Sequence, residues 1–183
     1  MNPTLFALCQ KAVVGPALWI TGQCAFAPPL PETPVTLATP GQVLSQEVEV
    51  PVTTGYFLSL GVQFPTVQDR LDDRLIGARY DVPCYGQGAR QLEDFPAEQR
   101  PDLGRPVRLQ VTVLTAKDGA VAWQADIASL CRAGHDLKRK KHQILALLPL
   151  AEGRYRLLVR NIEARPDLAG LDVSVTLHAG SGK

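Results

Sequence analysis

The chain has few aromatic residues, almost no net charge and only short apolar runs, and each shortage argues against a class of function. Aromatic residues make up 6% of the 183 residues, too few for the stacked platforms of a glycosidase cleft. The formal net charge is +1, so no overall field attracts nucleic acid or an anionic membrane. The apolar run at residues 12–20 is nine residues long, whereas a membrane-spanning helix needs about 20.

Residues 1–27 have the three parts of an export signal. Lys11 is the only charge before residue 32, the apolar run follows it directly, and Thr21-Gly22 forms a small polar end. Two cleavage sites compete: the stretch ending at Cys24 resembles the lipobox of bacterial lipoproteins, and Ala25-Phe26-Ala27 has an ordinary signal-peptidase pattern. We predict export to the periplasm or outer membrane of a Gram-negative bacterium, with Cys24 as the candidate lipidation site. A buried N-terminal strand is the alternative.

Export determines how the remaining cysteines are interpreted. Cys84 and Cys131 lie beyond the export segment, and an oxidising compartment makes them a candidate disulfide. Two unrelated thiols fit the sequence equally well. We predict no catalytic, cofactor-binding or metal-ligating residue, because Cys131, His135 and His142 lack the CxxC or HxxxH spacing of a zinc site.

The domain pattern is mainly β. Residues 28–42 contain a Pro-rich segment that is either an extended linker or an irregular edge strand. From residue 43 to 183 we predict one antiparallel β-sandwich, immunoglobulin-like or jelly-roll-like. Alternating apolar residues predict strands at 43–50, 56–64, 107–113, 121–123, 144–150, 154–162 and 171–177.

Two local signals supplement these strands. Thr66 with Asp69 predicts the N-terminus of a short helix at 67–76. Asp118-Gly119 predicts a hairpin with a type I′ turn.

The most specific motif combines Leu150, Gly153 and Tyr155 ahead of an apolar strand. A Leu-x-x-Gly-x-Tyr step of this kind is typical of a tyrosine corner, in which the phenol hydroxyl bonds to the backbone upstream. It indicates an architecture, and we assign Tyr155 to stability.

Residues 150–170, together with 104–109 and the strand at 56–64, carry a family resemblance. In these residues the chain resembles an uncharacterised family of proteobacterial exported proteins, many of them lipoproteins. The resemblance implies an exported β-sandwich without an assigned activity. It also suggests, by association with small lipoproteins of this kind, an immunity-type role in blocking a secreted toxin.

Two surfaces are candidates for binding. One is the irregular stretch at 78–104, which includes Tyr85. The other is the basic run of Lys138, Arg139, Lys140 and Lys141, which could dock an acidic partner or only guard the following apolar strand against edge pairing.

From these surfaces we predict a non-enzymatic domain that binds another protein of the cell envelope and no nucleic acid or cofactor. The alternative is a small-ligand module for a glycan or lipid, with Trp123 and Tyr85 as contacts.

Overall fold

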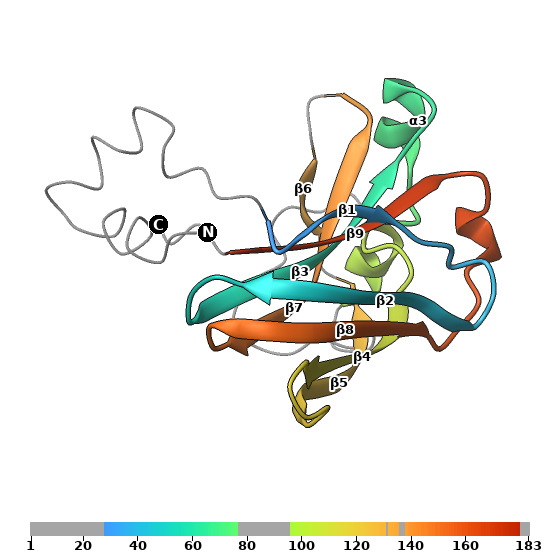
Figure 1. The fold of residues 1–183 in the computed structure, drawn as a ribbon. Helices are drawn as coiled ribbons and strands as arrows, with labels where there is room; N and C mark the ends of the chain where they lie inside the picture. The colour runs from blue at the N-terminus through green and yellow to red at the C-terminus, as the bar shows by residue number, and fades with distance from the viewer. Residues whose placement is uncertain (1–27, 77–95, 131, 136–137, 180–183) are drawn as a thin grey trace, which may run out of the picture.

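A computed structural model describes residues 28–76, 96–130, 132–135 and 138–179, which form an antiparallel β-sandwich (Figure 1). The five-stranded sheet A has the order β1 (Leu30–Pro34), β9 (Asp172–Ala179), β3 (Thr54–Gln63), β7 (Lys140–Leu150), β6 (Arg132–His135). The four-stranded sheet B has the order β2 (Gly41–Val50), β8 (Gly153–Asn161), β4 (Val107–Thr115), β5 (Val121–Ser129). The predicted mainly-β sandwich with one short α-helix is confirmed.

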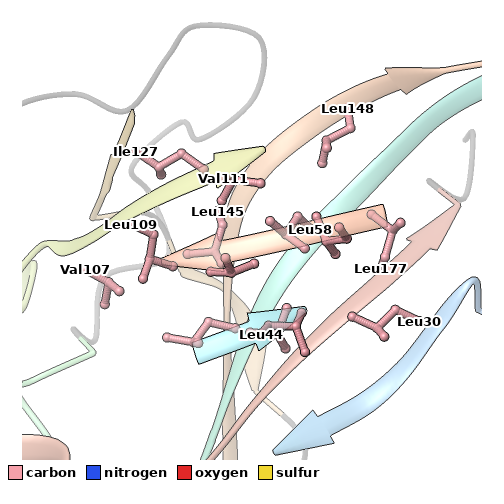
Figure 2. Packing of buried hydrophobic residues seen from close by; sticks show 14 of the residues in the cluster. Leu30, Leu44, Leu58, Val107, Leu109, Val111, Ile127, Leu145, Leu148 and Leu177 are labelled. Carbon is pink, nitrogen blue, oxygen red and sulfur yellow. The ribbon is translucent and has the colours of Figure 1, made fainter. Parts of the chain in front are cut away.

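The core lies between the inner faces of the two sheets (Figure 2). In β4, every second residue from Val107 to Val113 is at most 1% exposed, as the period of two in a strand requires. The residues predicted to share one face of β3 are also buried, and Leu58 is fully inaccessible. Burial of these alternating apolar side chains is the main force holding sheet A against sheet B.

The predicted helix at 67–76 is confirmed in its first part. Helix α3 (Val67–Asp72) begins at Thr66, whose hydroxyl accepts from the amide of Asp69 in a complete capping box. The helix ends four residues earlier than predicted, because the carboxylate of Asp73 accepts from the amides of Leu75 and Ile76 at 2.8 and 3.2 Å. Two short 3₁₀ helices, η2 (Ala97–Asp102) and η3 (Pro166–Leu168), complete the described elements.

The Pro-rich segment belongs to the sandwich. Of the two interpretations of residues 28–42, the linker is wrong for β1, which pairs with β9, and for Gly41 and Gln42, which begin β2. Leu30 and Leu37 are each 2% exposed. Prolines are tolerated in β1 because an edge strand uses only part of its backbone for pairing, and the buried leucines attach it to the core.

The hairpin between β4 and β5 forms where predicted, but its turn is different. Gly119 has a φ of +71°, and no described non-glycine residue has a positive φ, whereas a type I′ turn needs two positive φ values in succession. Asp118 instead accepts from the amide of Ala120 and from the Thr115 hydroxyl. These bonds lower the pKa of Asp118, with the Thr115 hydroxyl as the largest cause.

The tyrosine corner has the predicted bond. The hydroxyl of Tyr155 donates to the carbonyl of Ala151 at 3.0 Å, and Gly153 has a φ of +158° beside the phenol ring. Leu150 is 3% exposed and packs in the core.

A second corner, which we did not predict, has the same geometry at the β2–β3 connection. The hydroxyl of Tyr56 donates to the carbonyl of Val52 at 2.9 Å, and burial of the phenol raises its pKa. The amide of Glu152 donates to the hydroxyl of Thr53 at 3.1 Å. Two crossings from one sheet to the other are therefore tied together at one end of the sandwich.

Candidate functional site

Several predicted site residues lie outside the described residues. These are the lipidation candidate Cys24, the disulfide candidates Cys84 and Cys131, and the contact residue Tyr85. Trp123 is described: it is partly buried and packs against the core from β5, which gives it a structural role.

The predicted basic surface separates into two parts. Lys138 and Arg139 are exposed, and both are joined to the α3 region. The side chain of Arg70 donates from Nε to the carbonyl of Lys138 at 3.0 Å, and Arg139 donates to the carbonyl of Pro65 at 2.7 Å.

Lys140 and Lys141 are 8% and 2% exposed, so neither contributes much to an exposed basic surface of the kind predicted. Strand β7 begins at Lys140, and the alternation of a strand sends one side chain to each face of sheet A. Each lysine pairs with a carboxylate on its own face of the sheet, and this pairing offsets the cost of burying its charge.

Lys141 forms the more deeply buried of these pairs. Its Nζ lies 2.7 Å from Oδ2 of Asp73 and also donates to the carbonyl of the same residue at 3.1 Å. The ammonium group is 5.7 Å from the centroid of the Phe64 ring, within the range of a cation–π contact. The pair fixes the turn after α3 against β7.

Lys140 crosses the outer face of sheet A. Its Nζ lies 2.5 Å from Oε2 of Glu32 on β1. The lysine stem runs over Gly61, where an added Cβ would lie 2.5 Å from Cε of Lys140 and 2.9 Å from Oγ of Ser174. A glycine is therefore required at this position for close passage of the lysine.

An open pocket of about 370 Å³ adjoins this crossing. Its lining includes the Lys140–Glu32 pair, Asp172 and Ser174. The hydroxyl of Ser174 is buried and has no hydrogen-bond partner among the described residues. The lining contains no aromatic side chain, so the pocket lacks the stacking surface expected of a glycan site.

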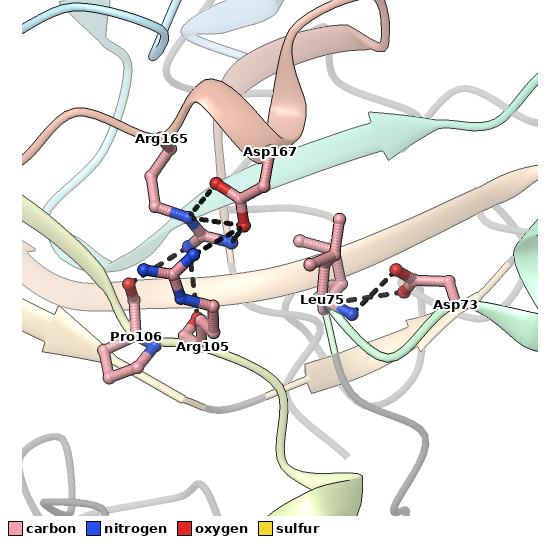
Figure 3. A network of polar contacts seen from close by, with 7 residues as sticks. Asp73, Leu75, Arg105, Pro106, Arg165 and Asp167 are labelled. Atoms are coloured by element: carbon pink, nitrogen blue, oxygen red, sulfur yellow. Dashed lines mark hydrogen bonds and ion pairs between the residues drawn. The ribbon is translucent and has the colours of Figure 1, made fainter.

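A further buried charge, which the sequence did not lead us to predict, is Arg165, which is 1% exposed. Its Nε and Nη2 donate to the carboxylate of Asp167 at 2.9 and 2.8 Å, and Nη1 donates to the carbonyls of Arg105 and Pro106 (Figure 3). The hydrogen bond from Arg165 is the largest cause that lowers the pKa of Asp167. The sequence carries the Arg-x-Asp spacing but no signal that it is buried.

Two charge clusters, Lys141 with Asp73 and Arg165 with Asp167, hold the two described ends of the connection between α3 and β4. Asp73 and Lys141 fix the chain just before it, and Arg165 fixes the chain just after it. Between these clusters, the amide of Arg105 donates to the carbonyl of Leu75 at 3.0 Å, so the two described ends of the connection lie side by side.

We call this region the α3 end and define it by residues 66–76, 105–106, 138–141 and 165–167. Its exposed charged side chains are four basic and two acidic, namely Arg74, Arg105, Lys138 and Arg139 against Asp69 and Asp72. Both acids already accept hydrogen bonds within the α3 segment, from Thr66 and Gln68 respectively. The α3 end therefore has two more exposed basic than acidic side chains, although one of the basic groups, Arg105, is ion-paired with Asp167 at 3.5 Å.

The described residues contain no cluster of three or more metal-ligating side chains. In the same part of the chain, no helix is long and apolar enough to cross a membrane.

Comparison with known proteins places this fold in a family. Residues 32–179 match the family described as "Domain of unknown function (DUF5625)". The chain belongs to the DUF5625 family. The match begins inside β1 and ends at the last residue of β9, so the family domain spans nearly the whole sandwich.

A protein of Sulfurospirillum deleyianum, known from a crystal structure, is similar in fold. The two chains are 19% identical with a TM-score of 0.57, over 85% of this chain and 100% of the other. At this identity the likeness supports the sandwich fold alone. No curated protein matches the chain at a significant level.

Proposed function

We propose that this DUF5625 protein is exported to the cell envelope, where it binds another protein through the α3 end and performs no chemistry of its own. The observation that carries the proposal is the surplus of exposed basic side chains on a region held in place by two buried charge clusters. Loops and turns mounted on a rigid scaffold are the usual recognition surfaces of sandwich domains.

The energetics support a role in recognition for this region. Removing a charged side chain from water costs several kcal/mol per ion before pairing, as an order of magnitude, and pairing only offsets that cost. Lys141 and Arg165 are both fully buried at the same end of the sandwich, where apolar residues would hold a core at least as well. What the pairs add is a defined position for the backbone at Asp73, Arg105 and Pro106.

The partner expected here is a protein with an acidic surface. Opposite charge across an interface raises the association rate and selects among partners. An immunity-type role, in which the partner is a toxin that enters the envelope, is one form of this proposal and rests on the family resemblance.

Site-specific photo-crosslinking in intact cells tests the proposal. A photoreactive residue at position 139 is compared with one at Glu47, an exposed position on β2 of sheet B. We expect a discrete protein adduct from position 139 and none from position 47. Identical adduct patterns at both positions, or an adduct at position 47 alone, would contradict docking at the α3 end.

Export itself is tested by mass spectrometry of the protein from the cell envelope. The proposal predicts either a lipid-modified Cys24 as the first residue or a free N-terminus after residue 27. A chain that retains Met1 would refute export.

The pocket beside the Lys140–Glu32 pair supports a second candidate, a small-ligand module. The polar lining, which includes Lys140, Glu32 and Asp172, suits a small polar molecule such as a lipid headgroup. Saturable binding of glycerophosphate headgroups that is lost in Lys140→Met, with no protein adduct at position 139, would favour this alternative.

A further inference from the structure

In the described part of the chain the sandwich has four edge strands, and they differ in how well they are protected against pairing with another strand. An unprotected edge presents free N–H and C=O groups that can template an added strand. Natural proteins block such edges with proline, charge, bulges or short length.

Three of the edges carry such protection. Strand β1 contains Pro31 and Pro34 and has an irregular register against β9. Strand β2 has an irregularity near its start and exposes Glu47 and Glu49. Strand β6 is only four residues long.

Strand β5 lacks these devices over most of its length. It has nine residues, contains neither proline nor lysine, and carries one charge, at Asp126. Its register irregularity is confined to the turn end, opposite Val113 and Leu114. Among the described strands, β5 pairs only with β4. At about 3.4 Å per residue, this edge is on the order of 30 Å long.

We infer that a second copy of this chain occupies the β5 edge, in an antiparallel β5–β5 pairing centred on Ala125. In this register Trp123 lies opposite Ile127 of the second copy, and Gln124 lies opposite Asp126. Aromatic–β-branched and amide–carboxylate pairs are among the favourable cross-strand combinations. Because the pairing is two-fold symmetric, each favourable pair occurs twice.

Neighbouring registers are less favourable. Centring the pair on Asp126 would place two carboxylates directly opposite each other, which is destabilising. Centring it on Gln124 would leave Trp123 opposite Ala125, with much less side-chain contact. Of these three registers, only the one centred on Ala125 forms both favourable pairs.

The neighbouring strand also suits this pairing. Asp126 accepts through Oδ1 from the side-chain amide of Gln110 on β4 at 3.1 Å. Its other carboxylate oxygen is the natural acceptor for Gln124 of the second copy. The dimer would contain one continuous eight-stranded sheet, in the order β2-β8-β4-β5 of one copy followed by β5-β4-β8-β2 of the other.

One shared strand edge buries less surface than a standard protein interface, so the dimer is expected to dissociate on dilution, with a Kd of roughly micromolar order. This interface is distinct from the α3 end. An experiment can therefore disprove partner binding at the α3 end without disproving β5 pairing, and the reverse.

Sedimentation equilibrium of the purified protein tests the inference. Between about 1 and 200 μM, a range set around that affinity, the mass should rise from that of one chain toward that of two; the unprocessed chain is 19.8 kDa. Amide hydrogen exchange should show protection that increases with concentration in β5 and not in β2. A protein that stays monomeric throughout, or a dimer protected elsewhere, would overturn the inference.

Charge variants test the register. Gln124→Asp creates two pairs of opposed carboxylates in the dimer, the new carboxylate of each copy facing Asp126 of the other. It should raise the Kd of the dimer by about tenfold. Adding Asp126→Lys should restore dimerisation by creating two Asp–Lys pairs. Gln42→Asp, an exposed residue on the β2 edge, is the matched control and should leave the dimer unchanged.

Two further outcomes count against the second copy. A dimer insensitive to Gln124→Asp would contradict this register. The protein could instead stay monomeric, with its β5 amides protected only when another envelope protein is added. That result would show that the other protein, and not a second copy, pairs with the β5 edge.

Discussion

Nζ of Lys141 lies 2.7 Å from Oδ2 of Asp73, and the two side chains are 2% and 3% exposed. This pair joins the first residue after α3 to the start of β7, 68 positions later in the chain. It also means that Lys141, which belongs to a basic run predicted to face solvent, is a buried structural residue. We expect the stability of the α3 end, and with it the proposed recognition of a partner, to depend on this pair.

Removing one member of this pair should be strongly destabilising. Lys141→Met leaves the carboxylate of Asp73 buried without its counter-ion, and the free energy of unfolding should fall by about 3–5 kcal/mol. Urea denaturation followed by circular dichroism measures the change. The same substitution at the exposed Lys138 should alter stability by about 0.5 kcal/mol or less, and equal losses at both positions would contradict the assignment.

The two tyrosine corners should contribute similar amounts. Tyr155→Phe and Tyr56→Phe each remove one hydroxyl that donates to a backbone carbonyl while keeping the buried ring. Each should lower the free energy of unfolding by about 1 kcal/mol, read as a shift in the urea midpoint. Tyr155→Phe should not change photo-crosslinking at position 139, because the corner lies outside the α3 end.

Gly61 should tolerate no side chain while Lys140 crosses it. Gly61→Ala places a Cβ where Cε of Lys140 lies, and overpacking of this kind costs about 1–3 kcal/mol. Thermal unfolding measures the loss. Because the clash is with a side chain, Gly61→Ala combined with Lys140→Ala should be more stable than the sum of the two single effects predicts; simple additivity would contradict the crossing.

The free energy of unfolding should fall in acid as Asp167 becomes protonated. Its pKa is lowered in the folded protein, chiefly by the hydrogen bond from Arg165, so its contribution is complete above the usual carboxyl pKa of about 3.9. The contribution disappears as the pH falls through the lower, folded pKa. Asp167→Asn should therefore cost about 3 kcal/mol at pH 7 and progressively less toward pH 2.

Urea midpoints at the two pH values measure this difference. Asp72→Asn, on the exposed surface of α3, is the control and should cost little at either pH. A penalty for Asp167→Asn that is independent of pH would show that the carboxylate does not act through its charge.

Local sequence patterns predicted most of the fold because they report backbone geometry directly. The alternation from Tyr56 to Phe64, the capping residues of α3 and the corner at Tyr155 are each local, and each is present in the structure. The turn at Asp118-Gly119 shows the limit of such patterns. There, the side-chain bonds of Asp118 select a different turn from the one that the dipeptide usually forms.

The candidate site was harder to predict because it depends on contacts between distant segments. Lys140 and Lys141 look alike in the sequence, yet adjacent positions on a strand face opposite sides, and each meets a carboxylate from a remote element. Arg165 gave no signal, because nothing local marks an arginine whose partners include the carbonyls of residues 105 and 106. A charge run is therefore informative only once its strand register is known.

The central claim, recognition of a protein at the α3 end, is tested most directly by charge reversal combined with photo-crosslinking. The double variant Lys138→Glu/Arg139→Glu is compared with Arg154→Glu/Arg160→Glu, which makes the same change of charge at exposed positions on β8. The photoreactive residue is placed at Arg74 in both. We predict that the first variant loses the protein adduct while keeping its unfolding midpoint, and that the second retains it. Retention in the first variant, or equal loss in both, would contradict docking at this end.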